Sequence, residues 1–189
     1  MEKLTGLKKV KTAVFISGTG SNLRNLIKFS KIKKSPVTIN LIISNSHLAK
    51  GLKFADQFKI KKKIFNFEKS EENILSLLKR EEIKFICLAG FMKILSKNFI
   101  KNFDGKIINI HPSLLPKYKG LNTHSRAIDN KDKFAGWTVH FVTKKLDSGK
   151  IILQKKIKIV AKDNANILAK KILKQEHKLY PAAIMKIFN

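Results

Sequence analysis

The chain has 189 residues, a length that fits one domain able to bury roughly 70% of the surface of its unfolded chain. Its 40 basic and 13 acidic residues give a net charge of +27, yet only Arg24, Arg80 and Arg126 are arginines. Because base-edge and bidentate phosphate recognition use the planar fork of arginine, and the lysines are dispersed along the chain, we expect no specific nucleic-acid partner. The charge still attracts small anionic ligands.

Two further features bound the class of protein. No apolar run approaches the ~18 residues of a membrane span, and no apolar leader follows the start, so no membrane partner is expected. The single cysteine, Cys87, lies in an apolar run, which excludes a disulfide framework and predicts a buried, inert thiol. We therefore expect a cytoplasmic protein with one domain over residues 1–189, of which residues 1–9 form a frayed extension.

The first half of the chain alternates strand-like and helix-like segments. The predicted strands are 12–17, 38–44, 62–67, 84–89 and 106–111, and the predicted helices are 21–29, 48–58, 71–80 and a shorter piece near 96–103. Continuous apolar strands are typical of a parallel sheet that is covered on both faces. This pattern predicts an α/β fold with a doubly wound, mostly parallel, Rossmann-like sheet and right-handed crossovers.

The second half departs from this alternation. Segments 137–143 and 150–159 are alternating strands joined by a turn-rich link, and they predict an antiparallel hairpin at the edge of the sheet. A C-terminal helix over about 164–178 follows, with a last short helix after Pro181.

The sequence Ser-Gly-Thr-Gly-Ser-Asn-Leu at 17–23 follows the first strand and opens the first helix. Glycines allow a ligand to approach the backbone, and a helix N-terminus offers free N–H groups, so a phosphate fits there. The segment is not a Walker A loop, and Leu23 stands where a dinucleotide fingerprint has its third glycine. An equally good interpretation is a tight turn with a serine or asparagine cap.

The most informative segment is 107–116, where an apolar strand carries Asn109 and His111 and then stops at Pro112. Side chains two residues apart leave the same face of a strand, and open α/β sheets bind ligands at the carboxyl ends of their strands. An amide donor beside an imidazole suits a reaction in which negative charge builds on an oxygen. Structural alternatives are a backbone-bonded histidine and a capping amide.

Asp147, in the link between the two hairpin strands, is by itself a common turn residue. If the hairpin folds back beside the 106–111 strand, its carboxylate reaches His111. A neighbouring carboxylate stabilises a charged imidazole and raises its pKa.

Four further histidines and one glutamate are candidate ligand or core residues. His47, His124, His140 and His177 have no convincing metal-ligand spacing, so no metal is expected. For His140, a place at the edge of the core is at least as good an interpretation as a role in the site. Glu176 shares the inward stripe of the terminal helix and needs a partner, which could be a ligand amine or a lysine such as Lys174 or Lys178.

Five segments carry a family resemblance when taken together and in this order: 17–23, Leu-Ala-Gly-Phe-Met-Lys-Ile-Leu-Ser at 88–96, Asn-Ile-His-Pro-Ser-Leu-Leu-Pro at 109–116, Leu-Asp-Ser-Gly at 146–149 and Gln-Glu-His at 175–177. With them the chain resembles the folate-dependent phosphoribosylglycinamide formyltransferases over nearly its whole length. The resemblance implies transfer of a formyl group from the co-substrate 10-formyltetrahydrofolate to the amine of glycinamide ribonucleotide, in purine biosynthesis, by a monomer or homodimer.

The resemblance also implies residue roles. The Asn109 and His111 positions stabilise the oxyanion, His111 supplies the proton, and Asp147 raises the imidazole pKa and organises a water. The nucleotide is implied to bind at Gly20, Ser21, Asn22, Pro112 and Glu176. The folate is implied to bind at Lys69, Met92, Lys93, Ile94, Leu95, Asn109, Thr143, Lys144, Lys145, Leu146 and Asp147, with Lys69 at its tail.

There are departures from the family pattern and alternatives to it. Leu173 stands where a polar residue is frequent near the phosphate, and Ser148 and Lys150 replace a glycine and a proline. Methionyl-tRNA formyltransferase and formyltetrahydrofolate hydrolase share the core but carry a further domain, for which this chain has no room. A basic nucleotide- or RNA-binding module without catalysis is a third alternative.

Overall fold

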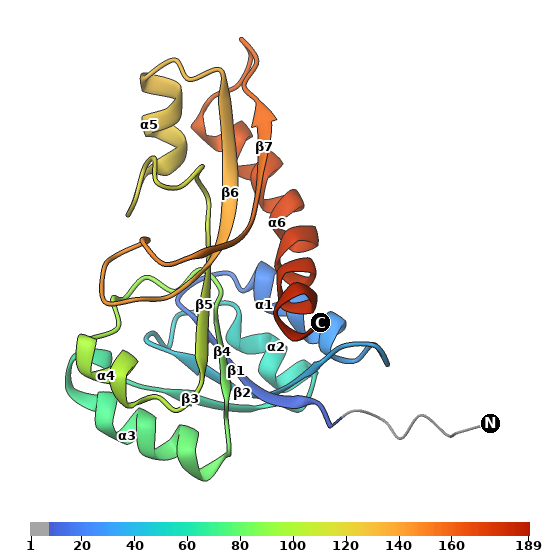
Figure 1. Ribbon diagram of the computed structural model, residues 1–189, viewed down its shortest axis with the longest axis vertical. Helices are drawn as coiled ribbons and strands as arrows, with labels where there is room; N and C mark the ends of the chain where they lie inside the picture. The colour runs from blue at the N-terminus through green and yellow to red at the C-terminus, as the bar shows by residue number, and fades with distance from the viewer. Residues whose placement is uncertain (1–7) are drawn as a thin grey trace.

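The computed structural model describes residues 8–189, which form one seven-stranded sheet with helices on both faces (Figure 1). The strands are β1 (Val10–Ile16), β2 (Val37–Ser44), β3 (Lys61–Ile64), β4 (Phe85–Leu88), β5 (Lys106–His111), β6 (Phe134–Phe141) and β7 (Ile151–Lys158). Their order is β3-β2-β1-β4-β5-β6-β7; the first five are parallel, and β6 and β7 are antiparallel additions. The predicted fold class is confirmed.

In the described part of the chain, six helices accompany the sheet: α1 (Ser21–Ser30), α2 (Leu52–Gln57), α3 (Phe67–Arg80), α4 (Lys97–Asn102), α5 (Thr123–Asp129) and α6 (Ala165–Phe188). Helices α1, α2 and α6 pack on one face of the sheet, and α3 and α4 pack on the other (Figure 1). The inner strands are apolar on both sides because both of their faces are covered. Strands β6 and β7 extend beyond the parallel core beside α6 and α5.

The C-terminal segment differs from its prediction of two helices. Helix α6 runs unbroken through Pro181, which lacks the N–H that would bond the carbonyl of His177. Nδ2 of Asn25, on α1, donates to that carbonyl at 2.5 Å instead. A partner from a neighbouring helix therefore satisfies the group that the proline leaves free, and the helix continues.

Other elements also differ from the prediction. Helix α5 was not predicted, because its seven residues carry too short an apolar pattern. Strand β3 ends at Ile64 rather than at residue 67, since the Asn66 side chain accepts from Glu68 N and starts α3. Residues 1–7 of the predicted extension lie outside the described residues, and Lys9 Nζ donates to the carbonyls of Ser30 and Ile32, each at 2.8 Å.

The topology gathers the chain's polar loops at one edge of the sheet. The first crossovers run outward from β1 to β2 and β3, and the chain then returns to β4 on the other side of β1. Such a switch point leaves a crevice at the carboxyl ends of the central strands. The glycine turn after β1 and the His111 end of β5 both lie at this edge. Among residues 8–189, no helix has the length and apolar character to cross a membrane.

Candidate active site

Asn109 and His111 end strand β5 on the same face, and the antiparallel neighbour β6 completes their surroundings. The register pairs Asn109 with His140 and His111 with Thr138. Asn109 Nδ2 lies 3.4 Å from His140 Nε2, while His140 Nδ1 lies 2.9 Å from the Phe141 carbonyl. Because that carbonyl can only accept, His140 Nδ1 carries a proton.

Asp147 lies beside this pair and contacts both histidines. Its Oδ2 is 3.4 Å from His111 Nδ1, and its Oδ1 is 3.5 Å from His140 Nε2. Residue 147 is 9% exposed and has a left-handed backbone with φ of 44°, so it belongs to a tight turn that projects inward. The structure thus brings Asn109, His111 and Asp147 together, and adds His140 to them.

The ionisation of the pair follows from burial and hydrogen bonding. Burial lowers the pKa of His111 below its ordinary value, and this outweighs the opposing effects of the Tyr118 carbonyl and of the Asp147 charge. Burial acts to raise the pKa of Asp147, but hydrogen bonds from His140 and from the Gly120 N–H outweigh it and hold that pKa low. The Asp147 charge acts to raise the His111 pKa, as expected, but burial has the larger effect and the pKa is lowered overall.

The His111 ring nevertheless lies between two acceptors. Nε2 is 2.8 Å from the Tyr118 carbonyl, and Nδ1 faces the Asp147 carboxylate. A doubly protonated ring satisfies both contacts, whereas burial favours the neutral ring. The residue is consequently placed to gain and lose a proton, as a group that moves protons must.

The glycine turn after β1 is open for an anion. Gly20 is the N-cap of α1, with φ of 73°, and no side chain accepts from the first turn of the helix. The alternative interpretation of this segment, a serine or asparagine cap, is therefore wrong. A Cβ on Gly20 would lie 2.5 Å from the Gly51 Cα, so the close packing of these two backbones requires glycine. The free N–H groups and positive helix end that remain suit a phosphate.

Glu176 faces this turn from helix α6. Asn22 Nδ2 donates to Glu176 Oε2 at 2.7 Å, and neither Lys174 nor Lys178 is its partner. Burial raises the pKa of Glu176, although the hydrogen bond from Asn22 opposes this. Asn22 Oδ1 is also buried and has no hydrogen-bond partner within residues 8–189. A ligand that supplies donors here would satisfy both groups.

Apart from Asn109 on β5 and Lys69 on α3, the predicted folate residues fall on two loops. Met92 and Ile94 are exposed at 64% and 74%, whereas the Leu95 side chain is buried in the core with Phe99. Lys93 Nζ pairs with Glu68 at 2.9 Å. The loop is joined to the glycine turn because Met92 N donates to Ser17 Oγ at 2.7 Å.

The second loop, residues 143–147, leads into Asp147. Thr143 Oγ1 donates to the Lys145 carbonyl at 3.2 Å, and Leu146 is 49% exposed. Lys144 and Lys145 are exposed, as is Lys69, which lies apart on α3 beside Glu68.

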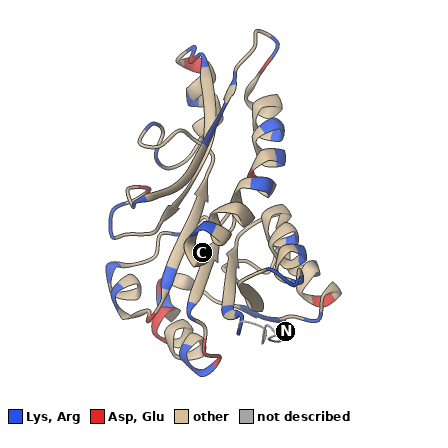
Figure 2. Cartoon of the chain, turned by 45° about the vertical axis from the view of Figure 1, so that its right-hand side comes forward, with Lys and Arg blue, Asp and Glu red and all other residues tan. Residues whose placement is uncertain are grey.

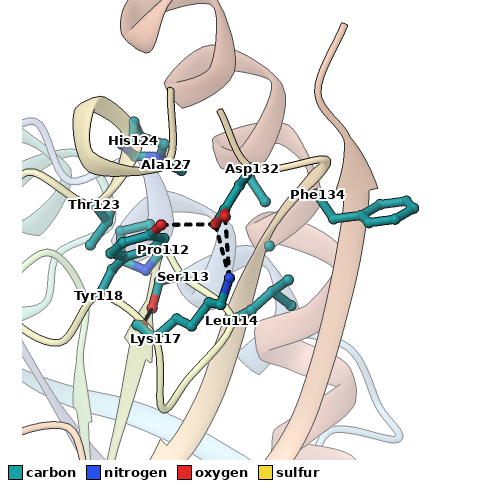
Figure 3. Close-up of a pocket in the computed structure, with 12 residues that line it drawn as sticks. Pro112, Ser113, Leu114, Lys117, Tyr118, Thr123, His124, Ala127, Asp132 and Phe134 are labelled. Carbon is teal, nitrogen blue, oxygen red and sulfur yellow. Dashed lines mark hydrogen bonds and ion pairs between the residues drawn. The ribbon is translucent and has the colours of Figure 1, made fainter. Parts of the chain in front are cut away.

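Two cavities are present among the described residues, and one of them includes Lys93 of the first loop. A cleft of about 350 Å³ is lined by Asn45, His47, Ile64, Phe65, Asn66, Phe67, Glu68 and Lys93. A much smaller cavity of about 10 Å³ lies behind Pro112, next to Tyr118, His124 and Asp132 (Figure 3). The second holds at most one water and is no substrate site. Within residues 8–189, no cluster of three or more His, Cys, Asp or Glu is placed to hold a metal ion.

Sequence reasoning left two parts of this site unassigned. The place of His140 follows from the β5–β6 register, which pairs it with Asn109. The pair of His111 and Asp147 also contacts the Tyr118 carbonyl and the Gly120 N–H. These are backbone groups, which no pattern of residue types predicts. Lysine and arginine are spread over most elements in Figure 2, consistent with a solvated basic surface.

Comparisons with known proteins agree with this geometry. The formyl transferase family model matches residues 10–184. The chain is 42% identical to the phosphoribosylglycinamide formyltransferase of Haemophilus influenzae, covering 92% of this chain and 85% of that protein. It is 39% identical to the human trifunctional purine biosynthetic protein adenosine-3, covering 95% of this chain but only 18% of that much longer protein.

Solved structures agree as well. The phosphoribosylglycinamide formyltransferase of Brucella melitensis has a TM-score of 0.89 and 41% identity, covering 95% of this chain and 96% of that chain. The one of Anaplasma phagocytophilum has a TM-score of 0.90 and 40% identity, covering 94% of this chain and 86% of that chain. The chain belongs to the formyl transferase family, among the phosphoribosylglycinamide formyltransferases.

Proposed function

We propose that the chain transfers the formyl group of 10-formyltetrahydrofolate to the amine of glycinamide ribonucleotide, giving the formylated nucleotide and tetrahydrofolate. The observation that carries the proposal is the cluster of Asn109, His111 and Asp147 at the carboxyl end of β5. The cluster opens onto the same sheet edge as the uncapped first turn of α1.

The nucleotide is assigned to the side of the site nearer α1. Its phosphate binds the N–H groups at Gly20, Ser21 and Asn22, where the helix end is positive. Its ribose or glycinamide part reaches Glu176, whose hydrogen bond with Asn22 joins the two elements. Pro112 ends the catalytic strand between them and fixes the direction of the chain after His111.

The folate is assigned to the opposite side. The loop of Met92, Lys93, Ile94 and Leu95 and the loop of Thr143, Lys144, Lys145, Leu146 and Asp147 form the walls of its pterin pocket. Exposed apolar side chains at Met92, Ile94 and Leu146 suit a flat heteroaromatic ring. Lys69 and Lys93 supply positive charge for the anionic tail of the folate.

The reaction follows from this placement. The amine nitrogen attacks the formyl carbon, a C–N bond forms, and the carbonyl electron pair moves onto the oxygen. Asn109 Nδ2 donates to this oxyanion, and a positively charged His111 ring, stabilised by Asp147, lies beside it. Such preorganised groups typically lower the barrier by about 3 kcal/mol each.

Collapse of the intermediate returns the electron pair and breaks the bond between the formyl carbon and N10 of the folate. The amine loses one proton and N10 gains one, so no net acid or base is consumed. His111 carries this proton, and Asp147 stabilises the charged ring during its transfer. No metal is needed for any step.

The proposal is tested by formyl transfer with the purified full chain, measured as tetrahydrofolate release. With glycinamide ribonucleotide as acceptor and no RNA present, we expect saturable turnover. Turnover only with methionyl-tRNA, or hydrolysis that does not depend on the nucleotide, would replace the proposal with one of the two related formyl-group activities. Binding of nucleotide without any turnover would make the chain a non-catalytic module.

A further inference from the structure

Arg126, on the short helix α5, is one of only three arginines in a chain with 40 basic residues. Its Nη1 donates to the Lys119 carbonyl at 2.8 Å and lies 3.4 Å from the Leu121 carbonyl. Its guanidinium carbon is 5.0 Å from the centre of the Tyr118 ring. A planar group that stacks on a ring while donating sideways is available from arginine and not from lysine.

Arg126 holds residues 118–121, the strap, in place. The strap contacts the proposed catalytic pair through backbone atoms alone. The Tyr118 carbonyl lies 2.8 Å from His111 Nε2, and the Gly120 N–H donates to Asp147 Oδ2 at 2.9 Å. These contacts depend on where the strap's peptide groups lie, and no strap side chain can substitute for them.

The strap's conformation needs external support. Tyr118 and Gly120 have φ of 54° and 77°, and Asn122, just beyond, has φ of 57°. Left-handed backbone at a bulky residue such as tyrosine costs free energy and persists only where surrounding contacts hold it.

One end of the strap has a second anchor. The Tyr118 hydroxyl donates to Asp132 Oδ2 at 2.9 Å and accepts from Asn130 Nδ2 at 3.1 Å (Figure 3 shows the contact with Asp132). The next residue contacts the neighbouring loop, because Lys119 Nζ donates to Ser148 Oγ. Among the described side chains, Arg126 is the one that donates to the carbonyls of Lys119 and Leu121, whereas the Tyr118 carbonyl accepts from His111.

We infer that Arg126 is a positioning residue for catalysis. By fixing the carbonyls on either side of Gly120, it holds the Gly120 N–H on Asp147 and the Tyr118 carbonyl on His111. The inference rests on the proposed function in so far as these two side chains are catalytic. Loss of the guanidinium therefore lowers kcat and leaves the KM of both substrates nearly unchanged, because Arg126 touches neither assigned binding region.

The test is Arg126→Lys, which keeps the charge and removes the fork, measured beside Arg80→Lys. Arg80 is exposed on α3, and within residues 8–189 its only ion pair is with the adjacent Glu81, so it is a matched control. We expect kcat to fall about tenfold in Arg126→Lys, with KM within about twofold of wild type, and no change in Arg80→Lys. Guanidinium ion at millimolar concentration should restore part of the kcat of Arg126→Ala.

Unchanged kcat in Arg126→Lys overturns the inference, and so does a fall that guanidinium does not relieve in Arg126→Ala. A second readout is independent of activity: the Gly120 amide should exchange hydrogen faster in Arg126→Lys than in wild type or Arg80→Lys. Equal exchange rates overturn the inference even where no enzyme turns over. A wild-type chain without turnover but with the expected exchange difference would instead contradict the proposed function.

Discussion

The Asp147 carboxylate lies 3.4 Å from Nδ1 of His111, and both residues are buried. The carboxylate comes from the link between β6 and β7, whereas the imidazole ends β5, so only the folded hairpin brings them together. The lowered pKa of Asp147 keeps its carboxylate ionised, and burial lowers the pKa of the His111 ring beside it. Such an arrangement stabilises the charged imidazole ring that forms during proton transfer.

Replacing Asp147 with asparagine keeps the shape of the side chain and removes its charge. We expect kcat to fall by about a hundredfold or more, because the charged His111 ring loses its counter-charge in the transition state. The KM for each substrate should change far less. Steady-state kinetics of tetrahydrofolate release measure both quantities, with Asp104→Asn as the control at an exposed ion pair with Lys84. Normal turnover in Asp147→Asn would remove the residue from the mechanism.

The stability of the protein should depend on pH through its buried histidines. Burial lowers the pKa of His111, His124 and His177, so below pH 6.5 the unfolded chain binds protons that the folded chain binds less readily. The free energy of unfolding should therefore fall as the pH drops from 7 toward 5.5, by at most about 1.4 kcal/mol per pH unit for each histidine. Urea unfolding at several pH values measures the slope, and His177→Gln should reduce it. A flat profile in wild type would contradict the pKa directions.

Glu176 contributes with the opposite sign. Burial raises its pKa, so its proton stabilises the folded state at low pH, and this contribution is lost as the pH rises through the folded-state pKa. Glu176→Gln should therefore increase the free energy of unfolding at pH 7 by roughly 1 kcal/mol, since a buried carboxylate no longer has to ionise. The same variant should raise the KM for the nucleotide several-fold and leave the KM for the folate unchanged. A loss of stability at pH 7, or equal effects on both substrates, would argue against the assignment.

The sequence patterns predicted the sheet and the edge hairpin from local periodicity, and the Asn109 and His111 pair from positions two residues apart in one strand. Asp147 was expected beside His111 only on the condition that the hairpin folds back, which the structure shows. Helix α6 was predicted as two pieces because a proline ends most helices. The donor that replaces the missing N–H comes from Asn25, which is far away in the chain. The Gly20 cap and the His111 pKa likewise depend on contacts with Gly51 and on burial, which no local pattern contains.

The continuity of α6 can be tested by a double-mutant cycle. Asn25→Ala leaves the His177 carbonyl without its donor and should cost about 1–2 kcal/mol of unfolding free energy. In a Pro181→Ala background, the restored N–H of residue 181 donates to that carbonyl, so the same substitution should cost much less. Chemical denaturation of the four proteins gives the coupling energy. Equal costs in both backgrounds would show that Asn25 does not replace the missing helical bond.

The most direct test of the central claim is a crystal structure with glycinamide ribonucleotide and a folate analogue. The analogue carries, in place of the formyl group, a carbonyl group that cannot be transferred. We predict that this carbonyl oxygen lies within about 3 Å of Asn109 Nδ2, that His111 lies beside it with Asp147 still in contact, and that the phosphate lies on the first turn of α1. A structure with both ligands bound, but with the carbonyl remote from Asn109 and Asp147 separated from His111, would contradict the account.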